Sequence, residues 1–264
     1  MRSRTTDQEM NLLKEGADWL GLELTPGQLS KFATYAAELV KWNQKFNLTA
    51  IRDIEGIQTK HFLDSLTCFL GFPGVEVSGF SRPLSNLSSL NGVMLMDVGA
   101  GAGFPGIPLA LARPAIRLAL LESARKKTRF LEHVVSVLDL DGVSVVTGRA
   151  EDVARLPDHR ELYDVVVSRA VADLTVLAEY CLPFTKIGGR FIAPKKGDVE
   201  AEIDAAEAAI AALGGKLTEI RSLEIPRLLE QRWLVLIDKV RITPREFPRR
   251  AGVPAKHPMT GNAS

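Results

Sequence analysis

The chain has 264 residues, enough for one sizeable domain with appendages or for two small domains, and its 46% hydrophobic and 25% charged residues are typical of a globular protein. No apolar run reaches the roughly 18 residues of a membrane span and the first ten residues lack a signal-peptide core, so we expect a cytoplasmic protein without a membrane partner. The net charge of +1 gives no long-range attraction to a nucleic acid, so the positive charge for such a partner must be gathered locally.

Residues 1–70 are predicted to form a helical N-terminal subregion, because apolar residues recur there at spacings of three and four. Thr25 followed by Pro26 is a favourable cap and first-turn pair for its second helix. Polar residues interrupt the apolar pattern further on. On their own they are interpreted as capping and turn residues, with Asn47 closing one helix and His61 hydrogen-bonded on the surface.

Residues 71–92 are rich in Gly, Pro, Ser and Asn, which predicts a linker to which we assign no chemistry. From residue 93 to residue 240, apolar strands alternate with helical patterns, which predicts a doubly wound α/β domain with a mostly parallel seven-stranded sheet. The expected strands are 93–97, 116–121, 143–147, 165–168, 190–193, 217–223 and 233–238. The expected helices begin at Pro105, Ala124, Ala150, Ala172, Val199 and Pro226. Ligands of such sheets bind beyond the carboxyl ends of the strands, where the strand order reverses.

Residues 97–106 form a glycine-rich turn between the first predicted strand of this sheet and its helix. The G-x-G-x-x-G pattern of dinucleotide binders fits residues 101–106, but it is out of phase with the strand. In a dinucleotide site the first glycine follows the strand at once, and counting from Gly99 puts Phe104 where the third glycine belongs. The acidic-x-G-x-G-x-G loop of S-adenosylmethionine-dependent methyltransferases is in phase, and its members are Asp97, Gly99, Gly101 and Gly103.

Acidic residues follow the first two predicted strands of the sheet. Asp97 favours S-adenosylmethionine, which carries an amino group for a carboxylate to meet and has no phosphate; alternatively, Asp97 merely caps the turn. Glu122 stands where an acid binds ribose hydroxyls, which indicates a nucleoside ligand without choosing between the cofactor classes. Its structural alternative is a cap or first-turn acid of the next helix.

The turns after the third and fourth strands carry two further candidates. Ala150 and Glu151 lie where an adenine ring would bind, although an acidic helix start explains them equally well. Arg169 lies in Ser-Arg-Ala, at the place where methyltransferases of exocyclic amines carry an Asn- or Asp-Pro-Pro-aromatic motif. This replacement favours a ring nitrogen as acceptor, because such a nitrogen has a free lone pair and no proton to remove. The alternative for Arg169 is a salt bridge to Asp173.

Basic residues gather in two places. The run Arg125, Lys126, Lys127 and Arg129 is either a solvated helix face or a contact to RNA phosphates. Residues 241–264 are predicted to be a basic, extended tail whose prolines exclude regular structure, and its cations include Arg245, Arg249, Arg250 and Lys256. The histidines and the two cysteines have no metal-ligand spacing, so we predict no metal.

Several motifs together resemble one known family. They are N-L-T at 47–49, H-F-L-D-S at 61–65, D-V-G-A-G-A-G-F-P-G-I-P at 97–108, S-R-A at 168–170 and P-R-R-A-G at 248–252. The glycine loop alone indicates only a methyltransferase, whereas this combination resembles the RsmG family, also called glucose-inhibited division protein B. These are the bacterial 16S ribosomal RNA guanine-N7 methyltransferases.

The resemblance implies a Rossmann-like S-adenosylmethionine-dependent methyltransferase fold and methyl transfer to N7 of one guanine in 16S ribosomal RNA. The implied partner is that RNA or the small ribosomal subunit, and we expect a monomer. The implied cofactor contacts are Gly99, Phe104, Ala150, Glu151 and Arg169, and Arg169 is also a candidate for orienting the substrate. The resemblance further makes Asn47, His61 and Asp64 candidates for the substrate side.

Three other functions stay open from the sequence. A Rossmann NAD-dependent oxidoreductase would bind a dinucleotide at the same turn. A small-molecule methyltransferase would share the cofactor loop but have no use for the basic tail. A non-enzymatic ribosome-assembly factor would bind RNA and cofactor without turnover.

Overall fold

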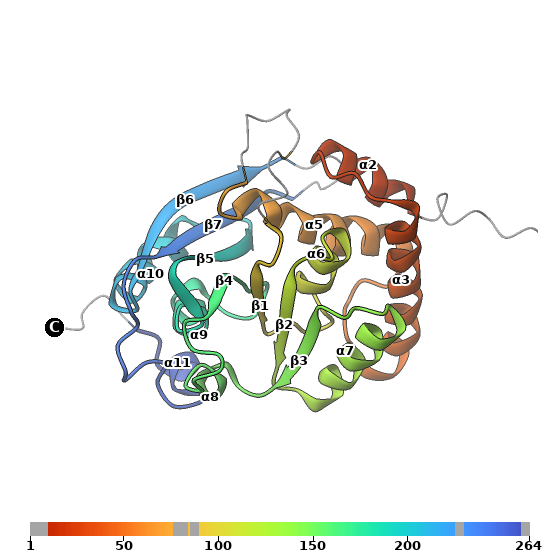
Figure 1. The fold of residues 1–264 in the computed structure, drawn as a ribbon. Helices are drawn as coiled ribbons and strands as arrows, with labels where there is room; N and C mark the ends of the chain where they lie inside the picture. Colours follow the sequence, from red (N-terminus) through yellow and green to blue (C-terminus); the bar gives the residue numbers. More distant parts are fainter. Residues whose placement is uncertain (1–9, 76–83, 85–89, 225–229, 260–264) are drawn as a thin grey trace, which may run out of the picture.

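A computed structural model describes residues 10–75, 84, 90–224 and 230–259. A central sheet carries helices on both faces (Figure 1). The helix predicted to begin at Pro226, residues 1–9 and most of the predicted linker lie outside the described residues.

The sheet has seven strands in the order β3-β2-β1-β4-β5-β7-β6. Strands β1 to β5 are parallel, and β7 is antiparallel to both of its neighbours, which confirms the predicted doubly wound, mostly parallel sheet. The strand order reverses between β1 and β4, so this is the place where a ligand is expected. The strands are β1 Met94–Val98, β2 Arg117–Glu122, β3 Val143–Thr147, β4 Tyr163–Val167, β5 Thr185–Lys196, β6 Gly215–Leu223 and β7 Arg232–Lys239.

One strand differs markedly from its prediction. β5 runs from Thr185 to Lys196, whereas the apolar run predicted only 190–193. From Arg190 to Lys196 it pairs residue by residue with β7. Because ladder hydrogen bonds join main-chain groups, strands can extend through polar residues that the apolar pattern excludes.

The helices of the sheet domain begin within two residues of the predicted positions. They are α6 Gly106–Ala112, α7 Arg125–Val137, α8 Ala150–Val153, α9 Leu174–Cys181 and α10 Glu200–Ala212. Alternate residues of β1 point to opposite faces of the sheet. Leu95 belongs to one core cluster and Met96 to a second one, which α9 and α10 cover.

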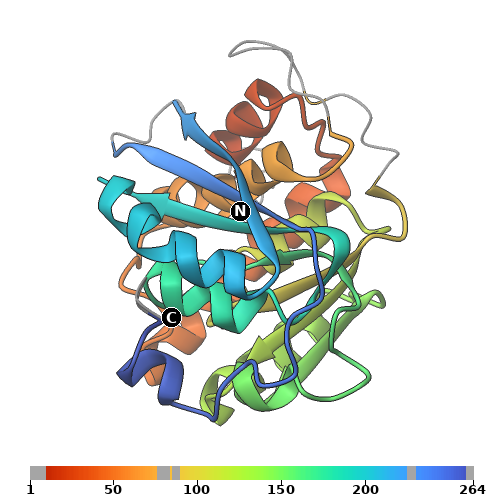
Figure 2. The same ribbon diagram turned by 90° about the vertical axis from the view of Figure 1, so that its left-hand side faces the viewer.

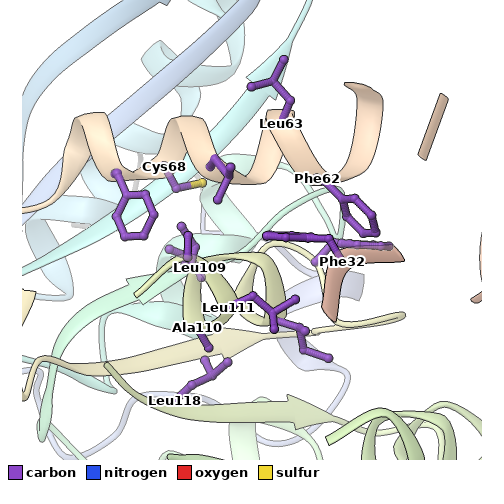
Figure 3. Close-up of a cluster of buried hydrophobic side chains, with 14 of the residues drawn as sticks. Phe32, Phe62, Leu63, Cys68, Leu109, Ala110, Leu111 and Leu118 are labelled. Carbon is purple, nitrogen blue, oxygen red and sulfur yellow. The ribbon is translucent and has the colours of Figure 1, made fainter. Parts of the chain in front are cut away.

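The N-terminal helices cover the first face of the sheet. They are α2 Asn11–Trp19, α3 Pro26–Phe46, α4 Ile54–Gly56, a π-helix at Ile57–Leu63, α5 Asp64–Leu66 and a 3₁₀ helix at Thr67–Gly71. Thr25 and the third helical residue, Gln28, form a capping box at the start of α3, and Asn47 ends that helix at a φ of 47°, as the sequence predicted. Phe32 and Phe62 pack together above α6 (Figure 3), which joins this subregion to the sheet through one continuous core.

The chain after β7 is only partly extended. Figure 2 shows it running from the end of β7 to a short helix, α11 Val253–Lys256. The prediction that its prolines exclude regular structure is wrong at this point, because Pro254 lies in the first turn of α11, where the missing N–H has no helical partner to lose.

Candidate functional site

A pocket of about 490 Å³ lies at the carboxyl ends of β1, β2 and β4, where the strand order reverses. Five parts of the chain line it: the glycine turn, the turn after β2, the turn after β4, the end of β5 and the N-terminal subregion. Representative lining residues are Leu48, His61, Gly101, Phe104, Glu122 and Arg169. Predicted site residues from distant parts of the sequence thus meet in one pocket.

The glycine turn requires residues without a side chain. Gly99, Gly101 and Gly103 all have positive φ, of 74°, 61° and 94°. The hydroxyl of Tyr35, on α3, donates a hydrogen bond to the Ala102 carbonyl at 2.5 Å and thereby fixes the turn from the helical side. Gly103 is buried behind the pocket wall, so its role is to shape the turn.

Replacing Gly103 with alanine is expected to lower the free energy of unfolding by about 2 kcal/mol. Alanine is strained at the positive φ of this position, and its Cβ would clash with neighbouring side chains. A Cβ there would lie 2.6 Å from the Tyr35 hydroxyl and 2.5 Å from Ile107 Cδ1. Gly27→Ala is the matched control, because its Cβ meets nothing closer than 3.9 Å and it lies within α3. Urea denaturation of both variants should show destabilisation for Gly103→Ala only; equal stabilities would contradict the assigned role.

Asp97 lies fully buried beneath the glycine turn. Its Oδ2 accepts a hydrogen bond from the Gly106 amide at 2.8 Å, while Oδ1 has no partner among the described residues. Burial raises the pKa of this carboxyl to about 7, although the Gly106 hydrogen bond and Arg169 oppose the rise. One oxygen therefore caps the turn, which was the structural alternative, and the other is a buried acceptor without a partner among the described residues. The interpretation that Asp97 serves a ligand stays a prediction.

Glu122, at the end of β2, ties two turns together. Its Oε2 accepts from the Gly101 amide at 3.0 Å and its Oε1 from the Ala124 amide at 2.8 Å, while Lys127 Nζ lies 3.9 Å from Oε2. A carboxylate has about four lone-pair positions, and the two amides occupy two of them. Glu122 therefore keeps acceptor capacity toward the pocket that it lines.

Arg169 does not pair with Asp173, the alternative weighed from the sequence. Its Nη1 lies 2.6 Å from Oδ2 of Asp64, and the other oxygen of Asp64 accepts from Arg232 Nε at 2.9 Å. Asp64 and Arg232 are each 4% exposed and Arg169 is 12% exposed, so this is a buried network that joins α5, β7 and the turn after β4. It holds the Arg169 guanidinium 5.3 Å from the centre of the Phe104 ring.

His61 is half-buried in the pocket wall, so the prediction that it lies on the surface is wrong. Its ring stacks on Phe104 with centroids 4.3 Å apart, Nε2 lies 2.7 Å from Thr49 Oγ1, and Nδ1 lies 3.4 Å from Arg169 Nη2. Burial, followed by the charge of Arg169, lowers the pKa of His61 to about 3. The imidazole is therefore neutral at physiological pH, and we assign Nδ1 as the acceptor facing Arg169.

The turn after β3 lies beside the pocket without lining it. The Gly148 amide donates to the Glu122 carbonyl at 3.1 Å, so the two turns are adjacent. Glu151 is 2% exposed and its Oε1 accepts from the Gly252 amide at 2.7 Å. Its carboxylate thus contacts the C-terminal segment, and Ala150 is half-buried at the start of α8.

The predicted RNA-contacting cations divide into three groups. Arg125, Lys126, Arg129, Arg245, Arg250 and Lys256 are exposed. Lys127 lines the pocket. Arg249 is ion-paired with the buried Glu179 at 2.6 Å.

Several site residues were missed from the sequence, among them Tyr35, Ile51, Lys60, Lys196 and Arg232. Lys60 and Lys196 line the pocket. Lys196 ends β5, so the rule that ligands bind at strand ends would have selected it had the length of β5 been known. Nothing in the local sequence marks Arg232 or Tyr35 as site residues, because the bonds that place them there, to Asp64 and to the Ala102 carbonyl, join residues more than 60 positions apart.

The described residues contain no group of three or more His, Cys, Asp or Glu side chains that could hold a metal ion. None of the helices in that part of the chain is long and apolar enough to cross a membrane.

Comparison with known proteins gives a consistent result. The family model described as GidB, rRNA small subunit methyltransferase G, matches residues 28–232. A ribosomal RNA small subunit methyltransferase G from Dehalococcoides mccartyi is 47% identical over 251 residues, which cover 95% of this chain and 100% of that relative. The protein of the same name from Roseiflexus castenholzii is 48% identical over 248 residues, covering 94% and 98%. Among solved structures, a chain in the complex of the Haloferax volcanii Trm112 methyltransferase activator gives a TM-score of 0.53 over 77% of this chain and 98% of that chain, at 14% identity, which shows a shared fold.

Proposed function

We propose, because this chain belongs to the ribosomal RNA small subunit methyltransferase G family, that it methylates N7 of one guanine in 16S ribosomal RNA. The family makes it an S-adenosylmethionine-dependent methyltransferase, and it removes the NAD-dependent oxidoreductase that the glycine stretch alone left open. Because its substrate is part of the ribosome, we place the reaction in the cytoplasm.

The residues that line the pocket, and Asp97 beneath it, fit this cofactor. Asp97 Oδ1 is a buried acceptor without a partner, the glycine turn brings main chain to the pocket wall, and Glu122 keeps lone pairs for ribose hydroxyls. When bound, S-adenosylmethionine supplies an electrophilic methyl group on a positively charged sulfur. We propose that Gly99, Gly101, Phe104, Glu122 and Arg169 line its site, with Asp97 and Gly103 supporting the turn from below.

The chemical character of the pocket carries the proposal of N7 as acceptor. Asp64 and Glu122 are held by guanidinium groups or amides, and His61 is a weak base because its pKa is about 3. An exocyclic amine would need one of these groups to accept its proton, whereas N7 carries an in-plane lone pair and no proton. Catalysis can then rest on orientation and on the exclusion of water.

We place the acceptor base at the end of the pocket lined by Leu48, Ile51 and His61, away from the turn after β2. Apolar and aromatic side chains suit an unstacked base, and an acceptor in an unpaired loop could reach them. Arg169 contacts His61 at this end of the pocket and also Phe104 of the glycine turn, so we propose that it orients the substrate.

The deciding experiment incubates the protein with labelled S-adenosylmethionine and bacterial small subunits or their RNA, and then maps the labelled nucleotide. We expect one 7-methylguanine in 16S ribosomal RNA. Label in free small acceptors would indicate a small-molecule methyltransferase. Binding of both cofactor and RNA without any label would indicate an assembly factor.

Exposed cations on α7 and on the C-terminal segment are proposed to hold RNA phosphates. Two double variants test this role, one with Arg125 and Arg129 replaced by glutamine and the other with Arg245 and Arg250 replaced by glutamine. Each should weaken RNA binding and reduce the magnitude of the slope of log affinity against log salt concentration by about 2. Arg117→Gln is the control, because this exposed residue begins β2, at the amino end of the strand, whereas the pocket lies at the carboxyl ends. Slopes that match the unmodified protein across a salt series would reject this role.

A further inference from the structure

We propose that residues 243–259, called the C-terminal strap below, position the turn after β3 and thereby set the affinity for S-adenosylmethionine. The inference rests on the proposed cofactor site. It assigns Arg249, which the sequence placed among the RNA contacts, to the cofactor side instead. It also gives the strap a role separate from its exposed charges.

The strap is bonded to the body of the domain along its first part. Two guanidinium groups from the connection between α8 and β4 donate to its main-chain carbonyls. Arg155 Nη2 reaches the Glu246 carbonyl at 3.0 Å, and Arg160 reaches the Thr243 and Phe247 carbonyls at 2.9 and 3.0 Å. Phe247 and Met259 pack against the core cluster under α9, so the strap is docked at both ends.

Arg249 is the strongest single anchor of the strap. Its main-chain N–H donates to Glu179 Oε1 at 2.7 Å, its Nε lies 3.0 and 3.1 Å from the two carboxylate oxygens, and its Nη2 lies 2.6 Å from Oε2. Glu179, on α9, is 1% exposed. A buried carboxylate that takes a main-chain amide and a forked guanidinium from one residue fixes that residue in place.

Three residues further on, the strap reaches the turn after β3. The Gly252 amide donates to Glu151 Oε1 at 2.7 Å, and Gly252 has a φ of 83° that favours glycine. Glu151 lies in α8, which begins two residues after Gly148, and Gly148 is hydrogen-bonded to Glu122 of the pocket. A continuous chain of contacts thus runs from Glu179 through the strap to the cofactor-side turns.

The outer face of the strap differs from its inner face. Arg245 and Arg250 are exposed, and their side chains make no hydrogen bond or ion pair within the part of the chain described here. Arg249 and Arg250 are therefore neighbours with opposite orientations: one is anchored inward on Glu179 and the other is free to meet RNA. This pair allows the two roles to be separated by single substitutions.

The test compares Arg249→Met with Arg250→Met in the full-length protein. Arg249→Met should raise the KM for S-adenosylmethionine about tenfold, because a tenfold loss of affinity corresponds to the free energy of one hydrogen bond to a charged group. The kcat at saturating substrates should stay within twofold of the unmodified value. Arg250→Met should leave that KM unchanged and raise the KM for RNA. Arg249→Lys retains the charge without the fork and should restore part of the affinity.

Gly252→Ala provides a second variant that does not depend on the ion pair. A Cβ at Gly252 meets nothing within 4 Å, so the substitution strains only the backbone that presents the amide to Glu151. It should also raise the KM for S-adenosylmethionine. The strap's role would be overturned if both Arg249→Met and Gly252→Ala kept that KM within twofold of the unmodified value, or lowered kcat alone.

Direct calorimetric titration with S-adenosylmethionine separates this inference from the proposed reaction. If the unmodified protein binds the cofactor but labels no RNA, the reaction is wrong, and the dissociation constants of the variants still test the strap. If the unmodified protein does not bind the cofactor, the cofactor site itself is wrong and the strap's role falls with it.

Discussion

Replacing Asp64 with alanine is expected to lower the free energy of unfolding by about 3–5 kcal/mol, because the substitution leaves two buried guanidinium groups facing each other without their shared carboxylate. Asp64 accepts from Arg169 at 2.6 Å and from Arg232 at 2.9 Å, and each oxygen serves one of them. Urea denaturation followed by circular dichroism measures this loss directly.

A second effect should accompany the loss of stability. Arg169 stands over Phe104 because Asp64 holds it, so the folded fraction of Asp64→Ala should bind S-adenosylmethionine more weakly and turn over more slowly. Asp64→Asn keeps an acceptor for one guanidinium and should lie between the two proteins in both measurements.

Asp173 provides the matched control for this network. It carries the same charge near the same arginine, but it is exposed and its side chain makes no capping bond at the start of α9. Asp173→Ala should therefore stay within about 0.5 kcal/mol of the unmodified stability. Equal losses for the two alanine variants would show that Asp64 does not hold these segments together.

Much of the sheet could be predicted because its signals are local. Strands β1 to β4 are short, mostly apolar runs, and the phase of Gly99 against β1 distinguishes the methyltransferase loop from the dinucleotide loop in the sequence itself. Local signals fail where main-chain pairing extends an element through polar residues, as in β5.

The network around Arg169 could not be predicted, for a physical reason. Asp64 and Arg169 are separated by 105 residues, and only the docking of the N-terminal helices on the sheet brings them together. In the sequence, Asp64 and His61 are polar residues in a helical pattern, which local reasoning assigns to caps or to the surface. The inward orientation of Arg249 could not be predicted for the same reason. Its partner Glu179 is distant in the sequence, and the adjacent Arg250 has the same side chain but faces outward.

Asp97→Asn is expected to stabilise the protein without cofactor at pH 8 and to weaken its binding of S-adenosylmethionine. Burial raises the pKa of Asp97 to about 7 from an ordinary value of 3.8. Between these two values the folded state binds a proton that the unfolded state has lost, so the free energy of unfolding falls as pH rises through this window. The difference between the two pKa values corresponds to roughly 4 kcal/mol, which is lost once the carboxylate is ionised above pH 7.

Asparagine keeps the acceptor for the Gly106 amide and removes the buried charge. The variant should therefore lose this part of the pH dependence and exceed the unmodified protein in stability at pH 8 but not at pH 4. Urea denaturation at both values checks this, and Asp152→Asn, an exposed acid on α8, should change neither stability nor its slope.

The cofactor should reverse the order of the two proteins. A positively charged ligand favours the ionised carboxylate, so the affinity of the unmodified protein for S-adenosylmethionine should rise from pH 6 to pH 8, while that of Asp97→Asn stays flat and about tenfold weaker. Calorimetry at both pH values would contradict the assignment if the two proteins gave the same profile. The expected result means that the buried charge of Asp97 costs stability in the free protein and contributes to binding the ligand, whereas the cap on the Gly106 amide needs only an acceptor oxygen.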